Sequence, residues 1–201
     1  MGVYSLAAAH RIAVLVAIGL LMGLLGPGPA CAEGPWKAQV VDAETGEPLE
    51  GVVVLMYWVT YTSSWAGWAG GDFHDAEEVV TGPDGRFVVP RRLVFTLIPW
   101  KKVSREMVIF KPGYGQWRFR EARQWDNLPR WESKAKFEEA WKRFEGEGVV
   151  LELSPLKTRE ERLKFYDGPY GHAPTLVPPE RTRRLDEARD TEARYLGLGA
   201  R

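Results

Sequence analysis

The sequence has little cysteine, little histidine and no net charge, and each of these shortages excludes a class of protein. Only one of its 201 residues is Cys, and three are His. A single Cys cannot close a disulfide within the chain, and with three His it cannot supply the Cys/His set of a structural zinc site. The 27 basic residues are balanced by 27 acidic residues, so no overall field attracts nucleic acid or an anionic membrane. Any such contact would need a local patch, and we expect no nucleic-acid partner.

Apolar and aromatic residues, by contrast, are plentiful. The chain is 45% hydrophobic and 12% aromatic, with nine Trp, eight Phe and seven Tyr. This content can offset the conformational entropy lost on folding, which excludes an intrinsically disordered chain. A length of 201 residues predicts one domain with appendages, or at most two small domains.

Residues 1–32 have the features of an export signal. They contain no acidic residue, and their apolar run from Ile12 to Leu25 is about 14 residues long, shorter than the roughly 20 residues of a spanning helix. Ala30-Cys31-Ala32 follows with the small-residue pattern of a secretory cleavage site. We expect a signal peptide over 1–32 and an exported bacterial protein, periplasmic or extracellular. Acylation of Cys31, as in bacterial lipoproteins, or an uncleaved signal would instead hold the protein at the membrane.

The residues after the signal alternate between strand patterns and Gly/Pro turns. Residues 36–42 alternate with a period near two, and 52–61 form a β-branched and aromatic run typical of a central strand buried on both faces. A Gly/Pro turn joins them into a predicted hairpin-like unit. Residues 78–81 and 86–90 flank a Gly-Pro-Asp-Gly turn and predict a second hairpin.

Later residues predict further strands at 107–110, 116–120 and 149–153, with 116–120 as the possible partner of 107–110 across the turn at 111–115. An amphipathic helix is predicted over 131–145. Several short strands without alternating helices favour an antiparallel β-sandwich over a parallel α/β sheet.

Three of these turns, in order, resemble one family. The chain is similar at three places to carboxypeptidase regulatory-like domains. The first is Val40-Val41-Asp42 with Thr45-Gly46, Pro48-Leu49 and Gly51-Val52, the second is Thr81 with Asp84-Gly85-Arg86-Phe87, and the third is Lys111-Pro112-Gly113-Tyr114. The resemblance implies a mainly β, transthyretin (prealbumin)-like antiparallel Greek-key sandwich over 33–153, with a non-catalytic role in binding or assembly. Insertions at 62–77 and 121–147 and the tail after 154 depart from the minimal pattern, and we expect individual function there.

The first insertion is the candidate ligand-binding segment. It places Trp65, Trp68 and Phe73 among small residues, and loops at the ends of a β-scaffold often carry binding residues. These rings could bind a carbohydrate or a peptide. The competing interpretation is that they fold back to cap the end of the core.

The same segment contains candidate metal ligands. Asp72, His74 and Asp75 have spacings that could bring oxygen and imidazole ligands to calcium or a transition metal. A solvated turn is the competing interpretation, and we expect no cofactor.

The chemistry of the chain does not favour an enzyme. Two enzyme families share or approach such a sandwich, the transthyretin-like hydroxyisourate hydrolases and the intradiol dioxygenases. After residue 32 the chain has only His74 and His172, and its end lacks the Tyr-containing motif of the hydrolases. We therefore predict a non-enzymatic exported module of the bacterial cell envelope with a protein or glycan partner. A metal-dependent enzyme is the remote alternative.

Residues 154–201 predict a helical C-terminal extension. A charged helix is expected from Ser154, as a possible N-cap, to Tyr166, then a Pro/Gly-rich loop over 167–179 and a second helix over 180–196. The second helix has few apolar residues. It either lies on its own domain through Leu185, Ala188 and Tyr195 or waits for a partner.

Overall fold

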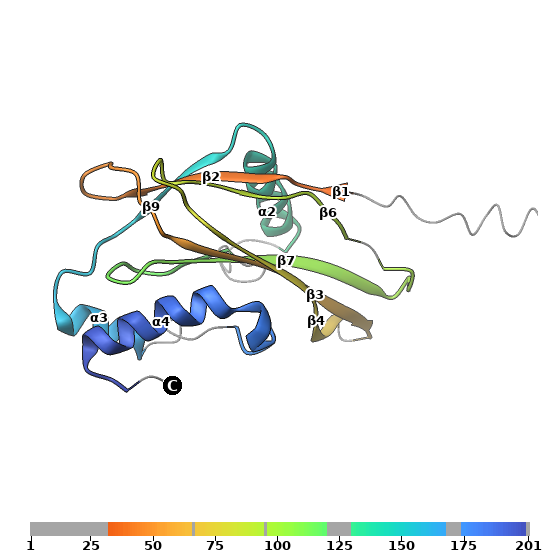
Figure 1. Cartoon of the computed structure of the whole chain (residues 1–201). Helices are drawn as coiled ribbons and strands as arrows, with labels where there is room; N and C mark the ends of the chain where they lie inside the picture. The colour runs from red at the N-terminus through yellow and green to blue at the C-terminus, as the bar shows by residue number, and fades with distance from the viewer. Residues whose placement is uncertain (1–31, 66, 95, 120–129, 168–173, 200–201) are drawn as a thin grey trace, which may run out of the picture. The chain divides into compact units, whose positions relative to one another are not determined.

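A computed structural model of the chain describes residues 32–65, 67–94, 96–119, 130–167 and 174–199 (Figure 1). The chain divides into two units, residues 1–31 and residues 32–201, and the second unit is described below. The predicted signal peptide, apart from Ala32, and the predicted lipidation of Cys31 lie outside the described residues. None of the helices in the described ranges is both long enough and apolar enough to cross a membrane.

The described unit is mainly β, as the turn-bounded strand patterns predicted. Its strands are β1 (Ala32–Glu33), β2 (Trp36–Asp42), β3 (Val53–Ser64), β4 (Gly67–Val80), β5 (Arg86–Val89), β6 (Arg92–Leu93), β7 (Lys101–Phe110), β8 (Trp117–Phe119) and β9 (Val149–Leu153). Its helices are α2 (Arg130–Glu145), α3 (Arg159–Tyr166), the short 3-10 helix η1 (Pro179–Arg181) and α4 (Arg183–Leu196).

The strands pair into two main sheets and a short ribbon. The four-stranded sheet has the order β4-β3-β7-β8 and is antiparallel throughout. The three-stranded sheet has the order β5-β2-β9; β5 is antiparallel to β2, whereas β9 is parallel to it, with Ala38 opposite Val149. A parallel pair needs a long connection, and residues 43–148 provide one. Strands β1 and β6 form the ribbon.

The four-stranded sheet is the middle layer and is covered on both faces. Along β3, Val54, Met56 and Trp58 belong to a cluster shared with the three-stranded sheet and α2, which we call the inner core. The intervening Val53, Leu55 and Tyr57 belong to a second cluster with Leu185 of α4, which we call the outer core. The predicted two-sided burial of this strand is therefore confirmed, and Figure 1 shows α3 and α4 on the opposite side of β3 and β7 from β2 and β9.

Helix α2 contributes aromatic residues to the inner core. Phe137, Trp141 and Phe144 are buried, and the Trp141 ring lies edge-on to Trp36 with centroids 6.1 Å apart. Arg105 of β7 ties the helix to the sheet by an ion pair of 2.9 Å with Glu138 of α2, and its guanidinium lies 5.0 Å from the Trp141 ring centroid. The helix predicted over 131–145 is confirmed, beginning one residue earlier.

The first two predicted hairpins are wrong, whereas the predicted pairing of 107–110 with 116–120 is confirmed, since β7 pairs with β8 and Ile109 lies opposite Trp117. Strands β2 and β3 belong to different sheets, as do β4 and β5, so the two turns carry the chain between sheets and do not pair their flanking strands. In the first turn, the Asp42 carboxylate accepts the amides of Glu44 and Thr45 at 2.7 and 3.1 Å. This local bonding closes the turn without any pairing of β2 with β3, and β3 instead forms a hairpin with β4.

The loop predicted at 62–77 is also wrong, because most of this segment is strand. Strand β3 runs to Ser64, and β4 begins at Gly67, with Ser64 opposite Gly67 and Thr62 opposite Ala69. The Ser64 hydroxyl donates to the Gly67 carbonyl at 2.7 Å and holds the tip together. Thr, Trp and Phe have high strand propensity, and the pairing with β3 extends this strand almost to the tip.

The three turns that carry the family resemblance meet at one corner of the unit. Thr81 donates to the Leu49 carbonyl at 2.6 Å and accepts the Val52 amide at 2.9 Å. Tyr114 donates to Asp42 at 2.9 Å. The backbone amides of the first turn, chiefly that of Glu44, lower the pKa of Asp42, while burial and the Asp42 hydrogen bond raise the pKa of Tyr114. These residues therefore hold the corner of the fold together.

The first helix of the extension begins later than predicted. Thr158, not Ser154, is the N-cap of α3: its hydroxyl accepts the Glu161 amide, and the Glu161 carboxylate accepts the Thr158 amide. This is a capping box. Pro155 forms a β-bridge with Tyr114, and the Leu156 amide donates to the Gly113 carbonyl at 2.8 Å. Pairing with the β7–β8 turn therefore keeps this stretch extended.

The second helix lies on its own domain. Leu185 is fully buried in the outer core, and Ala188 packs against it. Tyr195 is more than half exposed, with the Arg162 guanidinium 3.4 Å from its ring centroid. Glu192 is buried and accepts hydrogen bonds from Arg162 and from the Gly113 amide, and this carboxylate raises the pKa of Arg162. The extension is thus part of the folded unit.

Candidate interaction surface

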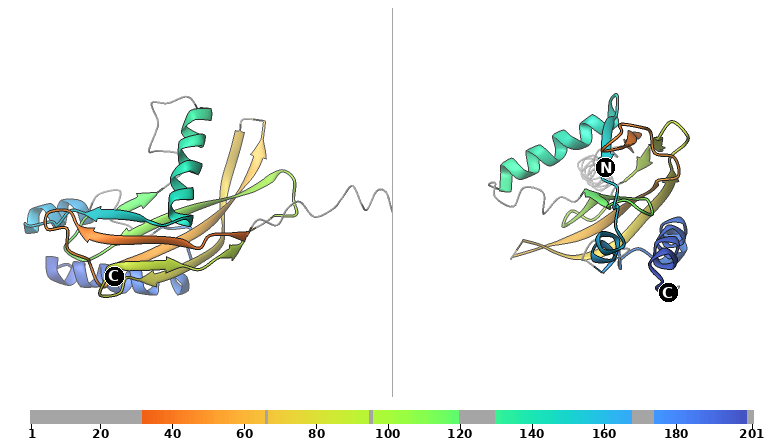
Figure 2. Two further views of the ribbon diagram at one scale, coloured as in Figure 1. Left: turned by 90° about the horizontal axis from the view of Figure 1, so that it is seen from above. Right: turned by 90° about the vertical axis from the view of Figure 1, so that its left-hand side faces the viewer.

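Large apolar side chains gather where the β3–β4 hairpin and the loop before β7 lie side by side. Strand β7 pairs with β3 up to Lys101 opposite Thr62, and the Ser63 amide donates to the Trp100 carbonyl at 2.7 Å. In the loop, the Lys101 amide donates to the Ile98 carbonyl at 3.0 Å. Figure 2 shows the far end of the β3–β4 hairpin projecting beyond the three-stranded sheet. The loop is therefore fastened to the hairpin by backbone pairing.

The exposed side chains of this region define what we call the aromatic end. Trp65 at the hairpin tip is fully exposed, Leu97 is 78% exposed, Trp100 is 60% exposed and Trp68 is 40% exposed. The full set is Trp65, Trp68, Leu93, Leu97, Ile98 and Trp100. Large apolar side chains exposed on neighbouring segments of a folded domain commonly mark a contact with another molecule.

The two chain segments that carry the aromatic end contain basic residues and no acidic residue. Residues 85–105 include six basic residues and no acidic residue, and residues 63–71 carry no charge. Lys102 extends between two rings, with its Nζ 5.2 Å from the centroid of Trp68 and 5.8 Å from that of Tyr61. At these distances the ammonium interacts favourably with both ring faces. The surface therefore combines indole rings with positive charge.

The predicted ligand-binding residues divide between two environments. Trp65 and Trp68 belong to the aromatic end, whereas Phe73 is half-buried and packs against the outer core. The prediction did not include Leu97, Ile98 and Trp100. The signal for them was present in the apolar run 93–100, which is flanked by a pair of basic residues on each side.

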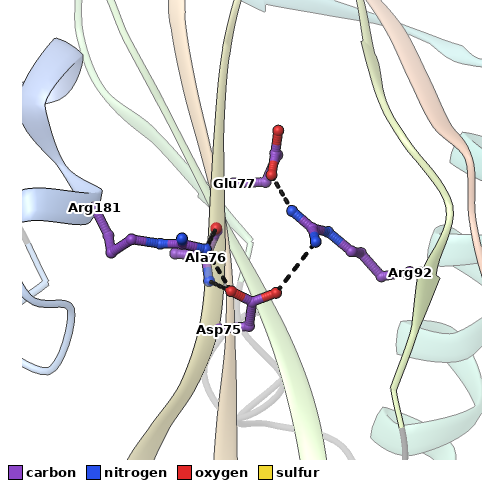
Figure 3. A network of polar contacts seen from close by, with 5 residues as sticks. All are labelled: Asp75, Ala76, Glu77, Arg92 and Arg181. Atoms are coloured by element: carbon purple, nitrogen blue, oxygen red, sulfur yellow. Dashed lines mark hydrogen bonds and ion pairs between the residues drawn. The ribbon is translucent and has the colours of Figure 1, made fainter.

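The predicted metal ligands lie on β4 with separate partners. Figure 3 shows Asp75 between Arg92 of β6 and Arg181 of η1, with Arg92 also paired to Glu77. The His74 Nδ1 lies 3.3 Å from the Thr60 hydroxyl, and Asp72 is exposed. Within the described ranges, no three His, Cys, Asp or Glu side chains form a group that could hold a metal ion.

The network around Asp75 joins three elements. The Arg181 guanidinium donates to both the Asp75 carboxylate and the Ala76 carbonyl (Figure 3). Glu78, farther along the same strand, accepts the Arg184 and Leu185 amides at 3.0 and 2.9 Å. Those amides belong to the first turn of α4, so a carboxylate from β4 supplies the cap that the helix lacks locally. The acidic side chains of β4 thus fasten η1, α4 and β6 to the sheet.

No protein-family model, curated protein or solved structure matches the chain. The resemblance to carboxypeptidase regulatory-like domains therefore rests on the residues of the three turns, and it stays a prediction.

Proposed function

We propose that the chain is a non-enzymatic, exported module of the bacterial cell envelope that binds a partner through its aromatic end. The observation that carries this proposal is the set of exposed indole rings on paired strands. Burial of one large apolar side chain contributes roughly 1.5–3 kcal/mol, so leaving six of them exposed forgoes stabilisation that a partner could recover. A binding role explains that arrangement.

We also propose that the fold is a transthyretin-like Greek-key sandwich. The two main sheets together contain seven strands in the described ranges, three and four, which is the number that the family resemblance implies. Four connections pass from one main sheet to the other: after β2, after β4, after β5 by way of β6, and after β8. The hydrogen-bonded corner formed by the three turns also supports the family assignment, since it gives the resembling residues one shared structural role.

A binding role is also supported by what the acidic side chains do. Asp75 is paired with two arginines, Glu192 with Arg162, and Glu106 accepts the Tyr57 hydroxyl at 2.5 Å. These groups have structural partners, so we assign them no catalytic role.

Export is the part of the proposal that the N-terminal sequence supports. We expect the chain, expressed from its full gene in a Gram-negative host, to be recovered in the periplasmic or membrane fraction. Intact mass should correspond to a chain that begins at Glu33, or at an acylated Cys31. Recovery of an unprocessed chain in the cytoplasm would overturn the proposed function.

A carbohydrate- or peptide-binding domain is the second candidate, favoured by Trp65 and Trp68, because exposed indole faces can stack on sugar rings. A panel of cell-wall glycans and peptides should then shift the Trp emission and reduce its quenching by acrylamide. The effect should vanish in the variant Trp65→Ala/Trp68→Ala. The matched control is Val88→Ala/Val150→Ala, which alters exposed apolar residues on the three-stranded sheet. A shift that persists in the Trp variant would exclude these residues as the site.

A further inference from the structure

The aromatic end has the side-chain chemistry of a membrane interface. Trp is enriched at the boundary between lipid headgroups and acyl chains, because its ring is apolar while its indole N–H can hydrogen-bond. Trp65 is exposed at the hairpin tip, and Trp100 is exposed in the neighbouring loop before β7, which also presents Leu97 and Ile98. Two neighbouring loops that each present an indole could enter one interface together.

The charge on this end complements an anionic surface. Arg91 and Arg92 precede the apolar run, and Lys101 and Lys102 follow it. Because Arg92 is paired with Asp75 and Glu77, the two lysines are the basic residues on which the argument depends. The first acidic residue of the hairpin, Asp72, comes four residues after Trp68. Basic residues beside an apolar insertion attract anionic lipid headgroups and are worth about 1 kcal/mol each near the membrane surface. A sugar ligand would need no such charge, so the basic residues favour lipid.

The start of the described chain adjoins the same loop. Ala32 lies opposite Leu93, and Glu33 opposite Arg92, in the β1–β6 ribbon. Leu93 is itself part of the aromatic end and leads directly into residues 94–100. A lipid on Cys31 would be attached one residue before Ala32, which lies opposite Leu93 of β6.

We propose that the aromatic end docks on an anionic lipid surface, with Trp65 and Trp100 at headgroup level and Lys101 and Lys102 contacting the headgroups. This inference rests on the proposed function, since it names the partner of the same surface. Docking at this end leaves the corner formed by the three family turns at the opposite end of β3, where it can face other envelope components.

The test uses the full chain and phosphatidylcholine vesicles that contain phosphatidylglycerol, with and without brominated lipid. Brominated lipid quenches only indoles that touch the bilayer, and Trp36, Trp58 and Trp141 are buried. We expect partial quenching of the Trp emission, most of it lost in Trp65→Phe/Trp100→Phe. Quenching of the same extent in that variant would overturn the proposal, because the contact would then lie elsewhere. The replaced side chains are exposed, so the circular dichroism spectrum should be unchanged.

A second experiment tests whether the positive charge of Lys101 and Lys102 directs the protein to anionic lipid. Quenching should be stronger on vesicles with phosphatidylglycerol than on pure phosphatidylcholine, and Lys101→Gln/Lys102→Gln should abolish that difference. The matched control is Lys37→Gln/Arg86→Gln, which removes two basic residues from the three-stranded sheet and should leave the difference intact. Equal quenching of the unaltered chain on both vesicle types would overturn the choice of an anionic surface.

These outcomes separate this inference from the proposed function. A chain that is exported but shows no quenching dependent on Trp65 and Trp100 retains the proposed function and loses the lipid partner. If a glycan then shifts the emission of the same residues, the sugar-binding alternative replaces it. A chain that remains unprocessed in the cytoplasm loses the proposed function, whatever the vesicle result.

Discussion

Replacing Leu185 with Ala tests whether the C-terminal extension is part of the folded unit. Leu185 is fully buried in the outer core, between α4 and the β3 residues that face away from the inner core. If α4 covers this face as described, the substitution leaves a cavity beneath the helix. If the helix instead waits for a partner, the substitution changes little.

The expected cost follows from the burial. Buried Leu-to-Ala replacements lose about 2–5 kcal/mol through lost transfer free energy and an unfilled cavity. Ala gains only about 0.2 kcal/mol in helix propensity, which does not offset that loss. We take about 3 kcal/mol as the expected destabilisation. For a chain of this size, it corresponds to a fall of about 6–12 °C in Tm.

The measurement is thermal and urea unfolding of the variant, followed by circular dichroism, beside a matched control. Leu97→Ala makes the same chemical change at a side chain that is 78% exposed, and it should alter the free energy of unfolding by less than about 0.5 kcal/mol. Equal Tm values for the two variants would refute the assignment of α4 as the cover of the outer core.

Three further predictions concern local contacts. Gly85→Ala should destabilise the fold by more than about 1 kcal/mol, because a Cβ there would lie 2.4 Å from the Val40 carbonyl oxygen at a φ of 69°. Gly46→Ala is the control for backbone strain alone, since Gly46 has a similar φ and open space around it. Equal losses of unfolding free energy in the two variants would contradict the steric argument. Glu78→Ala removes the cap of α4 and should cost about 1 kcal/mol in urea unfolding, whereas an unchanged midpoint would show that solvent caps the helix equally well. Because the pKa of Asp42 is lowered in the folded state, its contribution to the free energy of unfolding is present above its unfolded pKa and is lost as pH falls through its folded pKa. In Asp42→Asn, the free energy of urea unfolding should therefore fall less steeply with pH below about pH 4 than in the unaltered chain. The same steepness in both would assign the pH dependence to other groups.

The prediction of the strands succeeded where the signal was local. Residues 52–61 are apolar or β-branched throughout, and such a run is stable only between two layers, so two-sided burial could be expected from the sequence. The helix over 131–145 could be expected for a similar reason, because the spacing of Phe137, Trp141 and Phe144 places them on one face. All three are buried in the inner core.

The pairing of the strands could not be predicted, because one turn sequence is compatible with two outcomes. The Gly82–Gly85 turn suits both a hairpin and a crossing between sheets, and the choice depends on which partners β4 and β5 find. Strand β4 pairs with β3 over nearly its whole length, and that extensive pairing outweighs the four-residue hairpin that β5 could offer.

Only part of the aromatic end could be predicted from the sequence, for a related reason. Trp65 and Trp68 lie among small residues, which predicts exposed rings, whereas Leu97 and Trp100 lie in an apolar run that is equally typical of a buried strand. Only the backbone pairing of Ser63 with Trp100 brings the two loops together. The burial of Glu192 was equally hidden, since its partner Arg162 lies 30 residues away on another helix.

The sequence by itself determined the elements, the turn residues and the apolar content of this protein, because these depend on side chains within a few positions of one another. The tertiary structure alone decided which strands pair, that α4 covers the outer core, and that two apolar loops form one surface beside Lys101 and Lys102. The physical reason is that each of these contacts joins distant segments whose local patterns permit more than one partner, and the partner is chosen by the total burial and pairing that the whole fold achieves.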